Sequence, residues 1–338
     1  MNLIYRDCSY YADCDLRVLQ DERFETRTYT MVGPPRATTS DEPPTALQAR
    51  ETYARGWVRS CAASLKLHVA RWGNCAGEDA NSALPIDPLP ASGALLAALL
   101  RAPGPLVLVG DSLIRDYFTL LACLLLPHLR VYPSMGHDAF FGKAGRALKL
   151  FTYVREAPLV IFQWWSPGTS LTAASAAVRG SSAVLFNGAA AHFETLADGL
   201  VALEDVARAL LAASNDSNKA PRIAVMDYLP SHFPGDPAGE YNASRRHTYH
   251  HGSCVAHKDP AAGQTSFRRR LLGKLASKHD WPLVPLWELA APNWKDHLKG
   301  GSPFVLEHLG GLDCRHWCNP GRTMVAVHER MLEWLHTI

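Results

Sequence analysis

The feature that most constrains the fold is an apolar, β-prone run that ends in a glycine and continues directly into a helical run. Residues 106–109 predict a buried strand, and Gly110 allows a sharp turn after it. An apolar run over residues 113–126 predicts a helix, so Ser112 stands at a strand-to-helix corner. N–H groups at a helix start favour negative charge, which suits an oxygen nucleophile whose attack creates an oxyanion. The structural alternative is that Asp111 and Ser112 are ordinary helix N-caps.

Short apolar strands and helices alternate through the rest of the chain. Further strands are predicted at residues 130–132, 147–154, 158–165, 182–186, 222–226 and 283–286, and helices at 54–69, 91–100, 192–213, 264–279 and 320–335. This alternation indicates an α/β fold with a mainly parallel sheet. Sites in such folds form at the carboxyl ends of the strands, where Ser112 and Asn187 are both expected.

A second polar motif lies in the loop expected before the last helix. Asp313 and His316 are three residues apart, so one loop supplies both a carboxylate and an imidazole. A serine hydroxyl is a weak nucleophile until a base removes its proton. His316 is suited to act as that base and Asp313 to orient it, which with Ser112 makes a candidate catalytic triad. The structural alternative is that Asp313 caps a turn and His316 is an ordinary half-buried histidine.

The cysteines of this loop allow two further interpretations. Cys314 and Cys318 flank His316, and a fourth ligand such as His308 or His328 would complete a zinc site. That spacing is uncommon for zinc, so we expect no metal. Disulfide bonds that brace the loop are the other interpretation, and they are compatible with catalysis because a general base must be held in place.

Candidate oxyanion donors are the backbone N–H of Ser112, the side chain of Asn187 and Gly136, which follows the second predicted strand. For Asn187 the structural alternative is a turn residue before Gly188.

Composition limits the choice of partner and compartment. The chain has 34 Lys and Arg against 32 Asp and Glu, so charge gives no support for a nucleic-acid partner. No apolar run reaches the roughly 20 residues that span a bilayer, so we expect no membrane contact from this sequence. Eight cysteines and sequons at Asn215 and Asn242 favour the secretory pathway. The first residues contain no signal-like apolar core, so we expect either a cytosolic protein with free thiols or a missing targeting segment, and we favour the second.

Together, these motifs resemble the SGNH (GDSL-like) esterase superfamily, and in more detail its PC-esterase branch, the trichome-birefringence-like proteins. The resemblance spans roughly residues 70–335, and four segments carry it: Val109-Gly110-Asp111-Ser112-Leu113-x-Arg115, Cys123-Leu124-Leu125, Val184-Leu185-Phe186-Asn187 and Asp313-Cys314-Arg315-His316-Trp317-Cys318-x-Pro320-Gly321. It implies an SGNH-like three-layer sandwich, with a mainly parallel central sheet flanked by helices. The catalytic domain would cover residues 71–338, after an irregular extension at residues 1–70.

The resemblance implies a role for each matching residue. Ser112 would be the nucleophile, His316 the base, Asp313 its partner and Asn187 an oxyanion donor. Arg115 matches the family's arginine after the serine and is expected to bind substrate. After Asn187 the family usually continues Thr-Gly-His-Trp, whereas this chain has Gly188-Ala189-Ala190-Ala191-His192-Phe193.

Family members are typically Golgi proteins with an N-terminal membrane anchor and lumenal disulfides, so the resemblance implies the Golgi lumen. It also implies that Cys123 bonds an upstream cysteine and that Cys254 bonds Cys314 or Cys318.

The function that the resemblance implies is O-acetyl transfer from an acyl donor to a polysaccharide hydroxyl through an acetyl-serine, without a cofactor. Trp164, Trp165, Trp294 and Trp317 are candidate platforms for sugar rings, with core packing as the alternative for each. Three rival functions remain: a carbohydrate esterase with the same triad, a catalytically silent carbohydrate-binding protein, and a zinc protein that uses the histidines of residues 247–257.

Overall fold

The computed structural model describes residues 15–19, 28–32, 88–125, 128–131, 147–152, 154–215, 220–242, 244–245, 249, 253–257, 265–297, 312–317 and 322–337. Within these ranges seven strands form one sheet, in the order β4-β5-β6-β3-β7-β8-β9. A separate antiparallel pair, β1 (Asp15–Leu19) and β2 (Thr28–Val32), lies in the segment that was expected to be irregular.

The sheet is parallel around its centre. Its strands are β3 (Leu106–Gly110), β4 (Leu129–Val131), β5 (Leu148–Thr152), β6 (Val160–Trp164), β7 (Ala183–Phe186), β8 (Arg222–Met226) and β9 (Leu283–Val284). Strand β3 pairs in parallel with β6 on one side and β7 on the other, and β8 and β9 extend the parallel half. Strand β5 is antiparallel to β6, and β4 to β5. The predicted α/β fold with a mainly parallel sheet is therefore confirmed.

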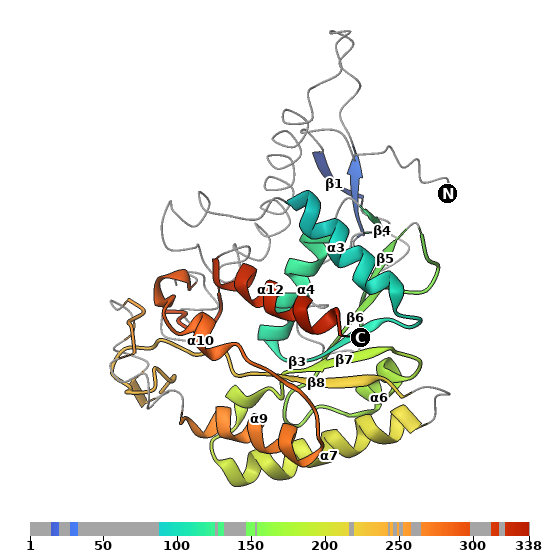
Figure 1. Cartoon of the computed structure of the whole chain (residues 1–338). Helices are drawn as coiled ribbons and strands as arrows, with labels where there is room; N and C mark the ends of the chain where they lie inside the picture. The colour runs from blue at the N-terminus through green and yellow to red at the C-terminus, as the bar shows by residue number, and fades with distance from the viewer. Residues whose placement is uncertain are drawn as a thin grey trace, which may run out of the picture.

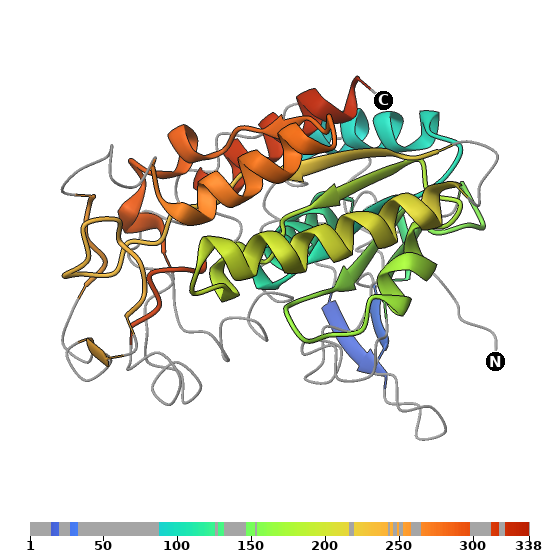
Figure 2. The ribbon, with the colours of Figure 1, turned by 90° about the horizontal axis from the view of Figure 1, so that it is seen from below.

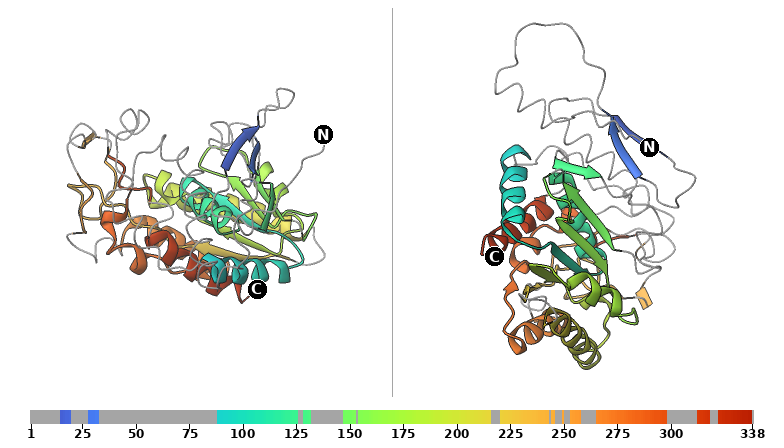
Figure 3. Two further views of the ribbon diagram at one scale, coloured as in Figure 1. Left: turned by 90° about the horizontal axis from the view of Figure 1, so that it is seen from above. Right: turned by 90° about the vertical axis from the view of Figure 1, so that its right-hand side faces the viewer.

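Helices cover both faces of this sheet (Figures 1 and 3). One face carries α3 (Pro88–Arg101), α4 (Ser112–Leu125) and α12 (Arg322–Leu335), and the other carries α6 (Thr172–Val178), α7 (Leu196–Asn215) and α9 (Phe267–Lys278). Strand β3 contacts the helices on both faces of the sheet, because successive side chains of a strand point to opposite faces. Leu106 and Leu108 pack with α3, α4 and α12, while Val107 and Val109 pack with α6, α7 and α9. The result is the expected three-layer sandwich.

Two helices of the second face run side by side across the sheet, α7 and α9 (Figure 2). Helix α7 was predicted to begin at His192, but a short 3-10 helix, η2 (Ala190–His192), comes first and α7 begins at Leu196. Helix α6 was not predicted, and neither was the single turn α10 (Trp287–Ala290). The helix predicted over residues 54–69 lies outside the described residues.

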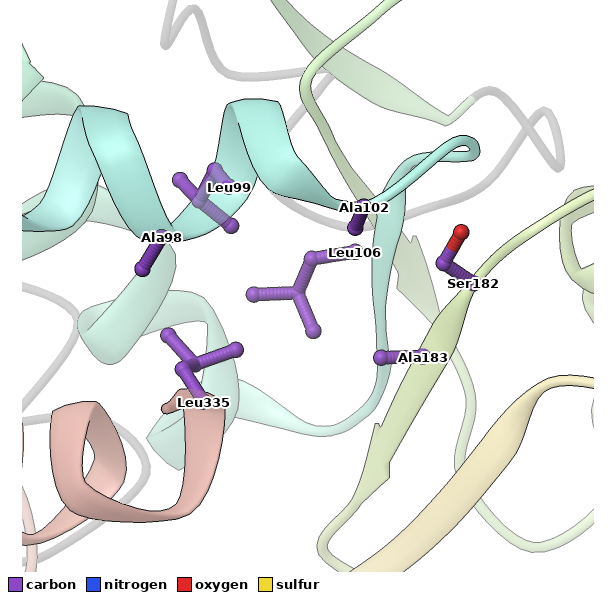
Figure 4. A pocket seen from close by; sticks show the side chains of 7 residues that line it. All are labelled: Ala98, Leu99, Ala102, Leu106, Ser182, Ala183 and Leu335. Carbon is purple, nitrogen blue, oxygen red and sulfur yellow. The ribbon is translucent and has the colours of Figure 1, made fainter. Parts of the chain in front are cut away.

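A small apolar cavity lies at the amino end of β3, between α3 and α12 (Figure 4). Its volume is about 10 Å³, which is space for about one water molecule. It is lined by Ala98, Leu99, Ala102, Leu106, Ser182, Ala183 and Leu335. Because Leu106 begins β3 and Ser112 follows its end, this cavity is at the opposite edge of the sheet from the candidate nucleophile.

Among the described helices, none is long and apolar enough to cross a membrane.

Helix α12 carries a buried histidine, His328, whose Nδ1 lies 3.4 Å from the hydroxyl of Tyr117. Burial lowers the pKa of His328 to about 4, below the value of about 6.5 in an unfolded chain. Between these values the unfolded chain binds the proton and the folded chain does not, so acidification destabilises the fold. This one group would contribute a loss of about 2 kcal/mol between pH 7 and pH 5.

We therefore expect the substitution His328→Phe to reduce the loss of unfolding free energy between pH 7 and pH 5 by about 2 kcal/mol. Urea denaturation at both pH values measures this difference, which is independent of any pH-invariant cost of the substitution. The matched variant His336→Phe changes an exposed histidine after the same helix and should leave the difference unaltered. An unaltered difference in His328→Phe would contradict the assignment.

Candidate active site

The carboxyl end of β3 is enclosed by its two parallel neighbours. Trp165 N donates to Gly110 O at 2.8 Å, and Asn187 N donates to Val109 O at 3.2 Å. Gly110 has φ 151°, and a Cβ there would lie 1.9 Å from Oδ1 of Asn187. Glycine is therefore required at this corner both by its backbone conformation and by the close approach of a side chain. The chain leaves β3 for β4–β6 on one side and later crosses to β7 on the other, which makes this edge a topological switch point.

Helix α4 begins at Ser112, directly after this corner. Asp111 is its N-cap, because its Oδ1 accepts from Leu113 N at 3.1 Å and its carbonyl accepts from Arg115 N at 3.1 Å. The backbone N–H of Ser112 has no hydrogen-bond partner in the described part of the chain. Asp111 is thus an ordinary helix N-cap, as the structural alternative proposed. Ser112 is the first residue of the helix and presents both its hydroxyl and a helix-start N–H.

The three residues of the candidate triad form one hydrogen-bonded chain. Nδ1 of His316 lies 2.7 Å from Oδ2 of Asp313, and Nε2 lies 2.8 Å from Oγ of Ser112. A carboxylate only accepts, so Nδ1–H donates to Asp313 and Nε2 is the acceptor that faces the hydroxyl. Burial opposes ionisation of Asp313, but the charge and hydrogen bonds of His316 bring the net pKa of this carboxyl below its usual value. Ser112 is 7% exposed and His316 5% exposed.

The loop that carries Asp313 and His316 is fixed in several ways. Oδ1 of Asp313 accepts from the backbone N–H of Arg315 at 3.1 Å and of His316 at 3.0 Å. Asp313 therefore caps its own turn, as the structural alternative for this residue holds, and it also contacts the imidazole. Cys314 forms a disulfide with Cys254, which is one of the two pairings that the resemblance implies.

Two buried histidines lie behind the loop. Nδ1 of His297 lies 3.0 Å from the carbonyl oxygen of His316, and its Nε2 lies 2.7 Å from Nδ1 of His232. Nε2 of His232 lies 3.0 Å from the carbonyl oxygen of Ala291. Burial lowers the pKa of both imidazoles, that of His232 to about 4. The backbone of the candidate base is therefore held by a buried pair that sequence patterns did not predict.

Arg115 is fully buried, and its expected contact with substrate stays a prediction. It lies on the inward face of α4, where its Nη2 is 3.1 Å from Oδ1 of Asp116. Burial lowers the pKa of Arg115, while the negative charges of Asp116, Asp111 and Asp313 act in the opposite direction. Its physical role is to balance buried carboxylates beneath the site.

Asn187 follows β7 and is bonded to Asp111 through both atoms of its carboxamide. Nδ2 donates to Oδ1 of Asp111 at 2.6 Å, while Oδ1 accepts from the N–H of Asp111 at 3.3 Å and of Ala189 at 3.0 Å. Nδ2 has a second hydrogen, and an oxyanion donor would use that one. The oxyanion role of Asn187 stays a prediction. Gly136 lies outside the described residues.

The candidate sugar platforms are mostly core residues. Trp165 is 3% exposed and its ring packs on Phe186, and Trp317 is fully buried with its ring centroid 3.9 Å from that of His297. A stacking platform needs an open ring face, so the burial of both residues fits the alternative of core packing, and their role as platforms stays a prediction. Trp164, at the end of β6, is half-buried and packs partly on the core.

The zinc interpretation of the cysteine loop does not fit the observed bonds. Cys314 is oxidised in a disulfide and both ring nitrogens of His316 are engaged, whereas zinc needs thiolate and free imidazole ligands. In the part of the chain that the structure describes, no group of three His, Cys, Asp or Glu side chains is arranged to hold a metal ion. The pairings expected for Cys123 and Cys318 lie outside the described residues and side chains.

No protein-family model matches this chain, and no curated protein matches it in sequence. The family resemblance rests on the motifs alone.

Loss of the disulfide is expected to destabilise the fold. The bond between Cys254 and Cys314 closes a loop with a sequence separation of 60 residues, and the chain-entropy model gives about 4 kcal/mol for a loop of this size. We expect the double variant Cys254→Ala, Cys314→Ala to lose unfolding free energy of about that size in urea denaturation. Wild type in reductant should lose at least as much, and equal stability of variant and wild type would contradict the prediction.

A methyl group at Gly110 is expected to displace the Asn187 side chain from Asp111. The variant Gly110→Ala should lose about 2 kcal/mol or more of unfolding free energy, because it combines a strained φ with a steric clash. Urea denaturation measures the loss. The control Gly93→Ala lies in α3, where a Cβ meets nothing within 4 Å, and should be neutral or stabilising. Wild-type stability of Gly110→Ala would show that Asn187 moves aside freely.

Proposed function

We propose that this protein is an O-acetyltransferase that moves an acetyl group onto a glycan hydroxyl through an acetyl ester of Ser112. The observation that carries the proposal is the hydrogen-bonded chain from Ser112 Oγ through His316 to Asp313. Such a chain supplies a nucleophile, a general base and an orienting carboxylate. The choice of a glycan acceptor comes from the motif resemblance, which supports it independently of the geometry.

In the first displacement, Oγ of Ser112 attacks the carbonyl carbon of the acetyl donor and its proton passes to Nε2 of His316. The developing oxyanion is stabilised by the Ser112 N–H, with the second Nδ2 hydrogen of Asn187 as a further donor. Asp313 stabilises the imidazolium through Nδ1–H. The carbon–oxygen bond to the leaving group then breaks, the leaving oxygen takes the proton from His316, and acetyl–Ser112 remains.

In the second displacement, a hydroxyl of the acceptor gives its proton to Nε2 of His316 and its oxygen attacks the acetyl carbon. The ester bond to Ser112 then breaks, and Oγ recovers the proton from the imidazolium. Water competes with the acceptor at this step. Ser112 and His316 are 7% and 5% exposed, and transfer requires that the bound acceptor keep water away from the acetyl–Ser112 ester.

Intact-protein mass spectrometry after incubation with an activated acetyl ester tests this function. Wild type should gain one acetyl group, and Ser112→Ala and His316→Ala should slow acetylation by at least about 1,000-fold. Asp313→Asn should lose a comparable or smaller factor because it acts through His316. The control Ser170→Ala removes an exposed hydroxyl before α6 and should behave as wild type.

Addition of a glycan panel to the acetylated enzyme then separates the candidate reactions. Faster loss of the adduct with acetylation of a glycan supports the transferase. Loss into water at the same rate with every glycan identifies an esterase. A wild type that gains no acetyl group under native conditions overturns the acyl-enzyme mechanism and leaves a binding protein.

A further inference from the structure

A second carboxylate–imidazole pair lies beside the triad. Asp111 precedes the candidate nucleophile in the chain and its carboxylate is buried. Nε2 of His192 lies 3.3 Å from Oδ2 of Asp111, on the carboxylate oxygen that Asn187 does not occupy. Burial opposes ionisation of Asp111, but the nearby His192 and then the charge of Arg315 hold the pKa of this carboxyl below its usual value. Asp111 is therefore an anion that holds one nitrogen of His192.

A turn after β7 brings His192 to this position. Gly188 has φ 65° and Ala189 has φ 44°, so two consecutive residues adopt left-handed backbone. For alanine this conformation is sterically unfavourable, and the bond from its N–H to Oδ1 of Asn187 holds it there. The N–H of His192 then donates to the carbonyl of Ala189 at 2.9 Å. The left-handed turn therefore places His192 beside Asp111 at the end of β3, at the cost of local backbone strain.

Among the side chains that contact Asp111, His192 is the one most open to other molecules. Its side chain is 45% exposed, against 14% for Arg315 and 6% for the residue Asn187. Nε2 of His192 faces the Asp111 carboxylate at 3.3 Å, outside hydrogen-bond geometry. In the neutral tautomer that carries its hydrogen on Nε2, Nδ1 has the free lone pair. His192 therefore offers an oriented acceptor beside a nucleophile that is itself almost covered.

We propose that Nδ1 of His192 accepts a hydrogen bond from a hydroxyl of the acceptor other than the one that is acetylated. This inference rests on the proposed acetyl transfer and names the acceptor class as a polyhydroxy compound. A bound polyol is held at two points, the reacting hydroxyl at His316 and a second hydroxyl at His192. A monohydric alcohol reaches only the first point. His192 is thus the residue that lets the acetyl-enzyme distinguish a sugar from a simple alcohol or water.

The partition of acetyl–Ser112 between competing acceptors tests the proposal. The acetyl-enzyme is formed with an activated acetyl ester and is offered methyl glucoside and ethanol together, at equal hydroxyl concentration. The two acetylated products are then quantified. Both products come from the same acetyl-enzyme, so their ratio does not depend on how much enzyme is folded or acetylated. We expect wild type to prefer methyl glucoside. His192→Phe, which keeps an aromatic ring without nitrogen, should lower the ratio about tenfold, the effect of one lost hydrogen bond.

Two further variants separate binding from a structural role. His192→Gln keeps an N–H for Asp111 and an oxygen that accepts, so it should retain most of the preference. His336→Phe makes the same substitution at an exposed histidine after α12 and should retain all of it. If His192 only supports Asp111, its loss slows both products equally and the ratio is unchanged. An unchanged ratio in His192→Phe, or no preference in wild type, overturns the inference while the acetyl-serine mechanism stands. Absence of any acetyl–Ser112 in wild type overturns the proposed function itself.

Discussion

The parallel pairing of β3 with β7 is the constraint on which the rest of the site depends. The bond from Asn187 N to Val109 O brings the ends of the two strands together, and Gly110 leaves room for the Asn187 side chain between them. That side chain then binds Asp111, which caps the helix that begins at Ser112. The position of the nucleophile therefore follows from backbone pairing in the centre of the sheet, where burial makes strand register most specific.

Two buried carboxylates give the site its electrostatic character, and each is compensated by imidazole contacts. Asp313 binds His316 at 2.7 Å and Asp111 contacts His192 at 3.3 Å. An uncompensated buried charge costs several kcal/mol, so these contacts contribute to folding as well as to orientation. The buried cation of Arg115 lies among the same carboxylates. In the proposed mechanism Nε2 of His316 takes the proton of Ser112, and the new positive charge would form in surroundings that already favour it.

Local patterns predicted the fold and the residues of the triad, but not the contacts that hold them. Apolar runs and turn residues indicated each strand of the sheet because those signals depend on near neighbours in sequence. Ser112 and His316 are 204 positions apart, so their contact was predicted from the chemistry of a catalytic triad and from the motif resemblance, not from spacing. His297 gives no signal at all, since a lone histidine in an irregular segment has no periodicity. The burial of Arg115 was not predicted, because a motif match does not reveal that the helix turns this side chain into the core.

Within the candidate site the side chains of Ser112 and His316 are nearly covered, whereas that of His192 is exposed. The groups that break and form bonds are nearly covered and fixed by bonds on several sides, including the disulfide at Cys314 and the His297 contact to His316. Such rigidity favours orientation of the reacting atoms. Recognition of a second substrate needs side chains that remain accessible, and His192 meets this requirement on a turn that follows directly from β7. The sheet edge thus combines a closed reacting centre with an open contact, both anchored on consecutive residues at the end of β3.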